Sequence, residues 1–136
     1  MSKRRASVVI AILMFICVPV IGQDEDDDKS YGRPNGRWYL KRDDQARIDL
    51  LYGIELGICL LVDENAISTK TADHYTVRGF RFGDLKNQVD KLYEDKANIR
   101  IPISYAYMYA IRRARGDPPR EIENFLSQLR KRFLER

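Results

Sequence analysis

The chain has 136 residues, of which 24 are Lys or Arg and 20 are Asp or Glu, and its formal net charge is +4. This length is that of one small domain and excludes large barrels and two-domain enzymes. Charged residues make up 32% of the chain and are mixed in sign, which excludes a membrane-embedded protein. The composition therefore predicts a soluble globular domain.

Residues 1–22 have the pattern of a secretory signal peptide. Basic residues at positions 3–5 precede an apolar run over 6–18, and Pro19 and the small Gly22 follow. The apolar run is shorter than the roughly 20 residues that span a bilayer, so we expect cleavage after Gly22 and no membrane span afterwards. The protein is therefore expected to be periplasmic or secreted, with an uncleaved N-terminal anchor as the alternative.

Cleavage would change both the charge and the cysteine content. Three of the 24 basic residues are lost, which leaves 21 against 20 acidic residues, so we expect no nucleic-acid binding. Cys59 would remain as a single cysteine, which cannot form an internal disulfide. Its apolar helical surroundings predict a buried, unreactive thiol. One cysteine and one histidine cannot supply a zinc ligand set, so neither a metal nor a cofactor is expected.

Residues 23–37 are predicted to form an acidic, disordered leader. Five consecutive acidic residues occupy positions 24–28, and several glycine and proline residues follow. Like charges in a run repel one another and oppose compact packing. The folded domain is therefore expected to comprise residues 38–136.

The first helix is predicted to run from Asp43 or Asp44 to about Val62. Both aspartates are good N-caps, and apolar residues follow at spacings of three and four. Gly53 and Gly57 lie one turn apart, and each costs a helix about 1 kcal/mol relative to alanine. We expect a neighbouring helix to pack closely against this glycine pair and offset the cost.

Residues 63–79 have no hydrophobic periodicity and are predicted to form a long exposed loop. Loops of this length in compact domains are functional or mobile. A loop anchored by helices can enter a cleft of a partner at small entropic cost, so this segment is the candidate partner-binding site. The candidate partner-binding residues are Asp63, Glu64, His74, Tyr75 and Arg78.

Three more helices are predicted after the loop. The second covers about residues 83–95, and the third covers about 101–114. Apolar residues in this third segment alternate as in a strand, but their spacing also forms an unbroken face of a helix, and we favour the helix. The fourth starts at Asp117, which is expected to cap it. The residues expected to line the buried face of this last helix are Ile122, Phe125, Leu126, Leu129 and Phe133. The sequence thus predicts an all-α, four-helix single domain.

The chain contains no recognisable catalytic motif. The single histidine, His74, has no pattern of Ser or Cys around it that would support nucleophilic catalysis. Asp90 and Glu94 lie one turn apart and would suit glycoside hydrolysis in a cleft, but lysines alternate with them as on a solvated helix face. The chain is therefore expected not to be an enzyme, and this carboxylate pair is the alternative.

Tyrosines at positions 105, 107 and 109 precede arginines at 112, 113 and 115. Such a combination can bind an anionic polymer, although tyrosines on a helix more commonly belong to the core. Export would leave a cell-envelope polymer as the anionic ligand. An envelope structural or scaffold protein that contacts such a polymer is therefore the alternative function.

A set of small, aromatic and apolar residues recurs along the predicted helices between about residues 38 and 114: Tyr52, Gly53 and Gly57, Gly83 through Leu85, Val89, Leu92 and Tyr93, Asn98, Pro102, Ala106 and Ala110. In these residues the chain resembles the Tai-type immunity proteins, which are periplasmic proteins that neutralise peptidoglycan amidases delivered by type VI secretion. The resemblance implies a non-catalytic binding module that blocks a secreted amidase. The chain departs from the family pattern because it lacks a cysteine pair and carries an additional helix over residues 117–136.

Overall fold

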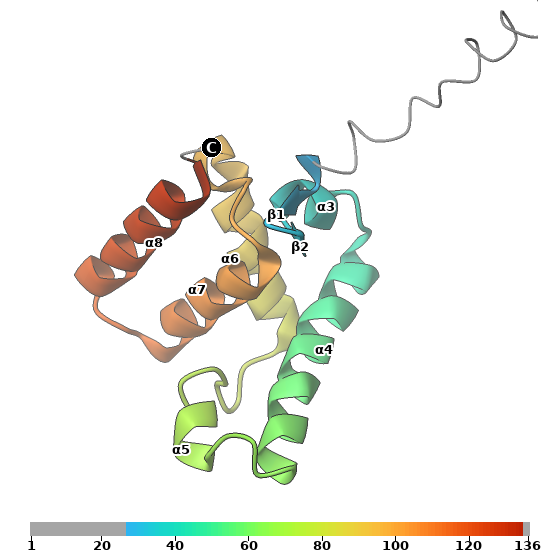
Figure 1. The fold of residues 1–136 in the computed structure, drawn as a ribbon, viewed down its shortest axis with the longest axis vertical. Coiled ribbons are helices and arrows are strands. Elements are labelled where there is room, and N and C mark those ends of the chain that lie inside the picture. The colour runs from blue at the N-terminus through green and yellow to red at the C-terminus, as the bar shows by residue number, and fades with distance from the viewer. Residues whose placement is uncertain (1–26, 135–136) are drawn as a thin grey trace, which may run out of the picture.

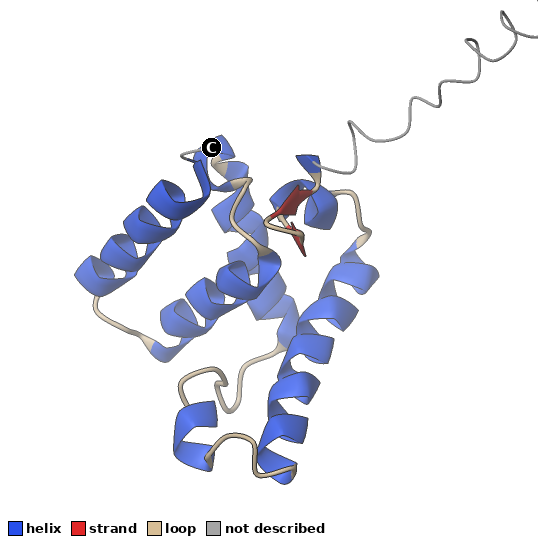
Figure 2. Cartoon of the chain, viewed as in Figure 1, coloured by secondary structure: helices blue, strands red, loops and turns tan. Residues whose placement is uncertain are grey.

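The computed structural model describes residues 27–134, which form one small all-α domain (Figure 2). Six α-helices, one 3₁₀-helix and one short hairpin are found in this part of the chain. The four long helices are α4 (Asp44–Asp63), α6 (Phe82–Glu94), α7 (Ile103–Arg115) and α8 (Pro119–Leu134). The predicted all-α, four-helix class is thus confirmed.

The long helices follow one another in space in the order α4, α6, α7, α8. Helix α6 contacts both α4 and α7, and α7 contacts α8. Helices α4 and α8 therefore lie at opposite edges of the domain (Figure 1). The core between them is built mainly from Leu51, Leu85, Val89, Leu92, Tyr93, Ile103, Ala106, Tyr107, Ala110, Ile111, Leu126, Leu129 and Phe133.

The first part of the described chain is a hairpin followed by a short helix. Strands β1 (Lys29–Ser30) and β2 (Arg33–Pro34) pair antiparallel, and α3 (Gly36–Leu40) follows them. Asn35 is 1% exposed, and its side-chain oxygen accepts the N–H groups of Arg37 and Trp38 in α3. The junction between the hairpin and α3 is anchored to the core because the Gly36 N–H donates to the Ile99 carbonyl at 2.9 Å.

The predicted disordered leader over 23–37 is therefore wrong for residues 27–37, and its first four residues lie outside the described part. Ion pairs explain the difference. The Asp27 carboxylate lies 2.8 Å from Arg37, and that of Asp28 lies 2.7 Å from Lys41. These cations neutralise part of the acidic run, so the domain begins before residue 38.

The helix ends follow the predicted signals closely. The Asp43 carboxylate accepts the Ala46 N–H at 2.8 Å and caps α4. Gly116 ends α7 with a φ of 79°, a left-handed conformation that favours glycine. Asp117 differs from its predicted role, because its carboxylate binds the Arg115 guanidinium at 2.7 and 2.8 Å.

Within residues 27–134 no helix combines the length and apolar character that a membrane crossing requires.

Buried polar groups join the last helices. The Tyr93 hydroxyl donates to the Ile101 carbonyl at 2.8 Å, and the Asn98 amide donates to the Leu92 carbonyl at 2.8 Å. The Asn98 side-chain oxygen in turn accepts a hydrogen bond from Arg130 of α8 at 2.8 Å. Because Asn98 is buried and in 3₁₀-helix η1 (Lys96–Asn98), it fixes α8 against the turn between α6 and α7.

The predicted close helix crossing at the glycine pair is wrong. No described atom outside the helix lies within 4 Å of a Cβ built on Gly53 or on Gly57. The close approach occurs at Gly36 instead, where a Cβ would lie less than 3.0 Å from three ring carbons of Tyr93. The glycines of α4 therefore face away from the neighbouring helices of the domain.

Tyr107→Phe is expected to leave the free energy of unfolding unchanged or to raise it by about 1 kcal/mol. Tyr107 is 1% exposed, its hydroxyl has no hydrogen-bond partner among the described residues, and burial raises its pKa. Removing an unsatisfied buried hydroxyl removes a desolvation cost. Urea denaturation followed by circular dichroism measures the change.

Tyr93→Phe is the matched control for that substitution. It deletes the hydroxyl that donates to the Ile101 carbonyl, so it should lower the free energy of unfolding by about 1 kcal/mol. Equal losses from the two substitutions would show that the Tyr107 hydroxyl has a partner.

Candidate partner-binding surface

The predicted partner-binding loop over residues 63–79 contains a short helix. Helix α5 (Thr69–Ala72) is capped by Ser68, whose hydroxyl accepts the Thr71 N–H at 3.1 Å. Asp63 is the last residue of α4, and Glu64 is its C-cap. The other candidates follow α5, with His74 and Arg78 exposed and Tyr75 half-buried.

The five candidates thus lie in two places, with Asp63 and Glu64 at the end of α4 and the other three after α5. The His74 carbonyl accepts a hydrogen bond from Arg115 at 3.3 Å, which attaches the loop to the end of α7. An open cleft of about 510 Å³ forms there, lined by Lys70, Asp73, His74, Arg112, Arg115, Asp117, Pro118 and Glu121. The lining contains both cationic and anionic side chains, so its charge favours neither an anionic nor a cationic ligand.

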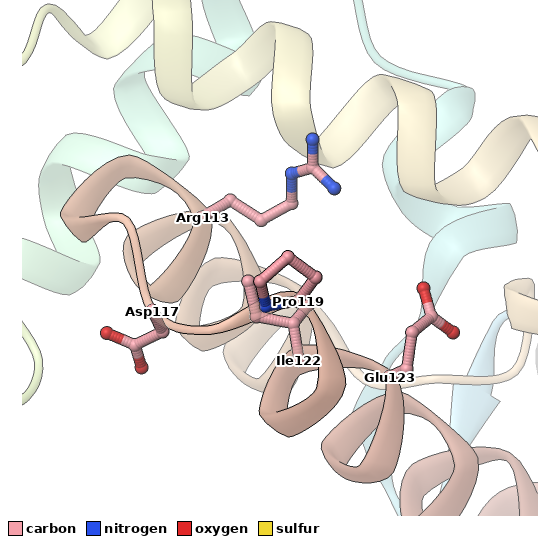
Figure 3. Close-up of a pocket in the computed structure, with 5 residues that line it drawn as sticks. All are labelled: Arg113, Asp117, Pro119, Ile122 and Glu123. Carbon is pink, nitrogen blue, oxygen red and sulfur yellow. The ribbon is translucent and has the colours of Figure 1, made fainter.

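The arginines after the tyrosine cluster make contacts within the domain. The Arg115 guanidinium binds Asp117, and the guanidinium of Arg112 stacks 4.7 Å from the Phe125 ring centroid. Arg113 is exposed and lines a second cleft, of about 180 Å³, with Asp117, Pro119, Ile122 and Glu123. Figure 3 shows Pro119 and Ile122 between the two acidic side chains of this cleft. Arg112 and Arg115 thus have partners within the domain, whereas Arg113 is exposed.

Asp117→Asn is expected to lower the free energy of unfolding at pH 7 by about 1 kcal/mol, after discounting for the solvent exposure of Arg115. The Arg115 guanidinium lowers the pKa of the Asp117 carboxyl. This stabilisation is therefore present above the ordinary carboxyl pKa and is lost as the pH falls through the lowered one.

Chemical denaturation of wild type and the Asn variant at several pH values tests this dependence. The difference in unfolding free energy should shrink at acid pH, because Asp117 is then protonated in both the folded and the unfolded state. A difference that stays constant from pH 7 to pH 2 would contradict the assigned ion pair.

The carboxylate pair on α6 is split between two environments. Asp90 lies 2.8 Å from Lys86 and 3.3 Å from Arg47 of α4, and the buried Lys86 also lies 3.0 Å from Asp44. Glu94 is exposed. Asp90 thus belongs to an ion-pair cluster that joins α4 to α6.

Across residues 27–134, no three His, Cys, Asp or Glu side chains gather as a metal site.

Several large apolar side chains of α4 are exposed. Tyr52, Leu56 and Leu60 follow one another at spacings of four and are 44–62% exposed, and Cys59 beside them is exposed as well. Residues at such spacings share one side of a helix. We call Tyr52, Leu56, Cys59 and Leu60 the outer face of α4. The prediction that the Cys59 thiol is buried is wrong.

The opposite side of α4 holds the helix in the domain. Leu51 is fully buried, and Leu50, Ile54 and Ile58 are partly buried against the core. Because α4 lies at the edge of the domain, the long helix that it mainly contacts is α6 (Figure 1). The outer face of α4 is therefore largely exposed to water, although the Tyr52 ring also packs edge to face against Phe82 of α6, with 5.2 Å between the ring centroids.

Apolar side chains that lie together on the outside of a small domain are typical of an interaction surface. Asp63 and Glu64 lie at the C-terminal end of α4, so the candidate loop adjoins the outer face of this helix. Comparisons of the chain with protein-family models, with curated proteins and with solved structures found no match.

Proposed function

We propose that this protein is an exported, non-catalytic protein-binding module, and that its partner is a peptidoglycan amidase toxin that it blocks. The proposed class of partner comes from the resemblance to Tai-type immunity proteins over residues 38–114. The observation that carries the binding role is the outer face of α4, where Leu56 is 44% and Leu60 is 62% exposed. Burial of these side chains against a partner would remove apolar surface from water and stabilise the complex.

The rest of the surface supports a binding role more than a catalytic one. Asp90 is held in ion pairs with Lys86 and Arg47, and the open cleft near His74 carries mixed charges. The loop over 63–79 adjoins the C-terminal end of α4, so a partner that covers the outer face also reaches Asp63 and Glu64. A single continuous interface can therefore include the helix and the start of the loop.

The test uses the tagged chain, expressed with residues 1–22 and recovered from the periplasm. Its intact mass should show that the chain begins at Gln23. Proteins retained by it from an envelope extract are identified by mass spectrometry, and each is then purified for calorimetry and for hydrolysis of peptidoglycan. A captured amidase that is inhibited at one-to-one stoichiometry supports the proposal.

Leu56→Lys should weaken binding of that amidase at least 100-fold, because the charged side chain is buried unpaired in an apolar interface. Leu134→Lys is the matched control, since Leu134 is 45% exposed on α8 at the opposite edge of the domain. Retention of a non-hydrolytic partner alone, or equal binding by Leu56→Lys and wild type, would overturn the proposal.

A further inference from the structure

We infer that the outer face of α4 binds a partner helix that has an apolar centre and a basic residue near each end. This inference rests on the proposed function, because it names the chemistry of the partner at that same surface. It follows from how charged side chains are distributed along α4.

The outer face of α4 lies between two acidic residues on the same side of the helix. Asp49 and Asp63 are each seven residues, or two turns, from Leu56, so all three lie on the same side of α4. Both aspartates are exposed, and so is Glu64. The two aspartates are 14 residues apart, which in a helix is about 21 Å.

The single cation of α4 does not reduce this acidic character. Arg47 is turned towards α6, where its guanidinium lies 3.3 Å from Asp90 and its side chain is 16% exposed. The side of α4 that carries the outer face and the two aspartates therefore holds apolar and acidic side chains, and the one basic residue of α4 does not lie on it. A cationic group near each aspartate would complement these charges.

A second copy of this chain fits the outer face poorly. If two α4 helices paired antiparallel about Leu56, Asp49 of one would lie opposite Asp63 of the other, and in a parallel pair each aspartate would lie opposite itself. Like charges placed together at an interface disfavour association. The same charges repel an anionic membrane surface, so the partner is a protein helix with basic ends.

The glycines of α4 fit such a helix. Gly53 is exposed between Tyr52 and Leu56, and a Cβ on it would meet no described atom within 4 Å. The space beside Gly53 is open, so a large apolar side chain of the partner would fit against the helix backbone there. Such a contact would explain a glycine in a helix that alanine would stabilise.

The test measures binding of synthetic 18-residue helical peptides to the protein by fluorescence anisotropy. All peptides share one stripe of leucine and alanine. One peptide carries lysines 14 positions apart on the side of that stripe, a second carries glutamates there, and a third carries its lysines only seven positions apart. We expect the first peptide to bind about tenfold more tightly than the other two at low salt, and the advantage to shrink at high salt.

The protein variants separate charge from apolar contact. The double variant Asp49→Lys with Asp63→Lys should prefer the glutamate peptide, whereas Glu94→Lys with Glu123→Lys, which changes exposed acidic residues elsewhere, should behave as wild type. Leu56→Lys should weaken the binding of all three peptides.

Several results would overturn the inference: no detectable binding of the matched lysine peptide, equal binding of the lysine and glutamate peptides, tight self-association in sedimentation, or binding to anionic vesicles instead. If an amidase is captured and Leu56→Lys releases it while the double charge reversal has no effect, the inference fails and the proposed function stands.

Discussion

Leu51→Ala should lower the free energy of unfolding by about 2–5 kcal/mol, because it removes the one fully buried side chain of α4 and leaves a cavity against α6. Leu51 and the partly buried Ile54 and Ile58 hold α4 in the domain. Losing Leu51 is therefore expected to weaken the attachment of the whole helix. Urea denaturation monitored by circular dichroism measures the effect.

Leu60→Ala is the matched control, since it makes the same chemical change on the same helix. Leu60 is 62% exposed, so its truncation should change the free energy of unfolding by no more than about 0.5 kcal/mol. If the two substitutions cost the same, the orientation of α4 would be different from the one described.

Gly36→Ala should lower the free energy of unfolding by about 1–3 kcal/mol. Its Cβ would lie less than 3.0 Å from Cγ, Cδ1 and Cε1 of Tyr93. Tyr93 cannot easily move away, because it is buried and its hydroxyl donates to the Ile101 carbonyl at 2.8 Å. Overpacking of a fixed ring displaces α3 or distorts the core. Thermal and chemical denaturation measure the loss.

Gly53→Ala makes the same change where space is open, and its expected effect has the opposite sign. The new Cβ meets no described atom within 4 Å, and alanine favours a helix over glycine by about 1 kcal/mol. The variant should therefore be more stable than wild type. A loss of stability would mean that another part of the chain packs against Gly53.

The helices and their ends could be predicted because their signals are local. The Asp43 cap of α4, the left-handed Gly116 at the end of α7 and the buried face of α8 each follow from a few neighbouring residues. Such signals act through the backbone of one helix and do not depend on the rest of the fold.

The packing of α4 could not be predicted from its sequence, because apolar residues lie on all sides of this helix. Its periodicity therefore does not distinguish the buried Leu51 from the exposed Leu60 and Cys59. The glycine pair has the same ambiguity, since small residues allow close approach of a helix from this molecule or from another one. Tertiary contact with α6 decides which side is covered.

The ordered hairpin before α3 was missed because its stability comes from residues far along the chain. Local composition shows an acidic run, whereas the structure pairs Asp28 with Lys41 and joins Gly36 to Ile99. Of the candidate loop residues, Asp63 and Glu64 adjoin the outer face of α4, whereas the His74 carbonyl accepts a hydrogen bond from Arg115 of α7. Side chains from separate helices cannot be placed by spacing alone.

The reactivity of Cys59 tests the role of the outer face most directly, because this thiol lies within it. In a Cys17→Ser background, the rate of alkylation of the folded protein is measured alone and with a saturating amount of the lysine peptide whose basic residues are 14 positions apart. We predict rapid alkylation of the free protein and at least a tenfold slower rate with the peptide bound. A thiol that does not react in the free protein, or a rate that bound peptide leaves unchanged, would contradict an uncovered outer face that binds a partner helix.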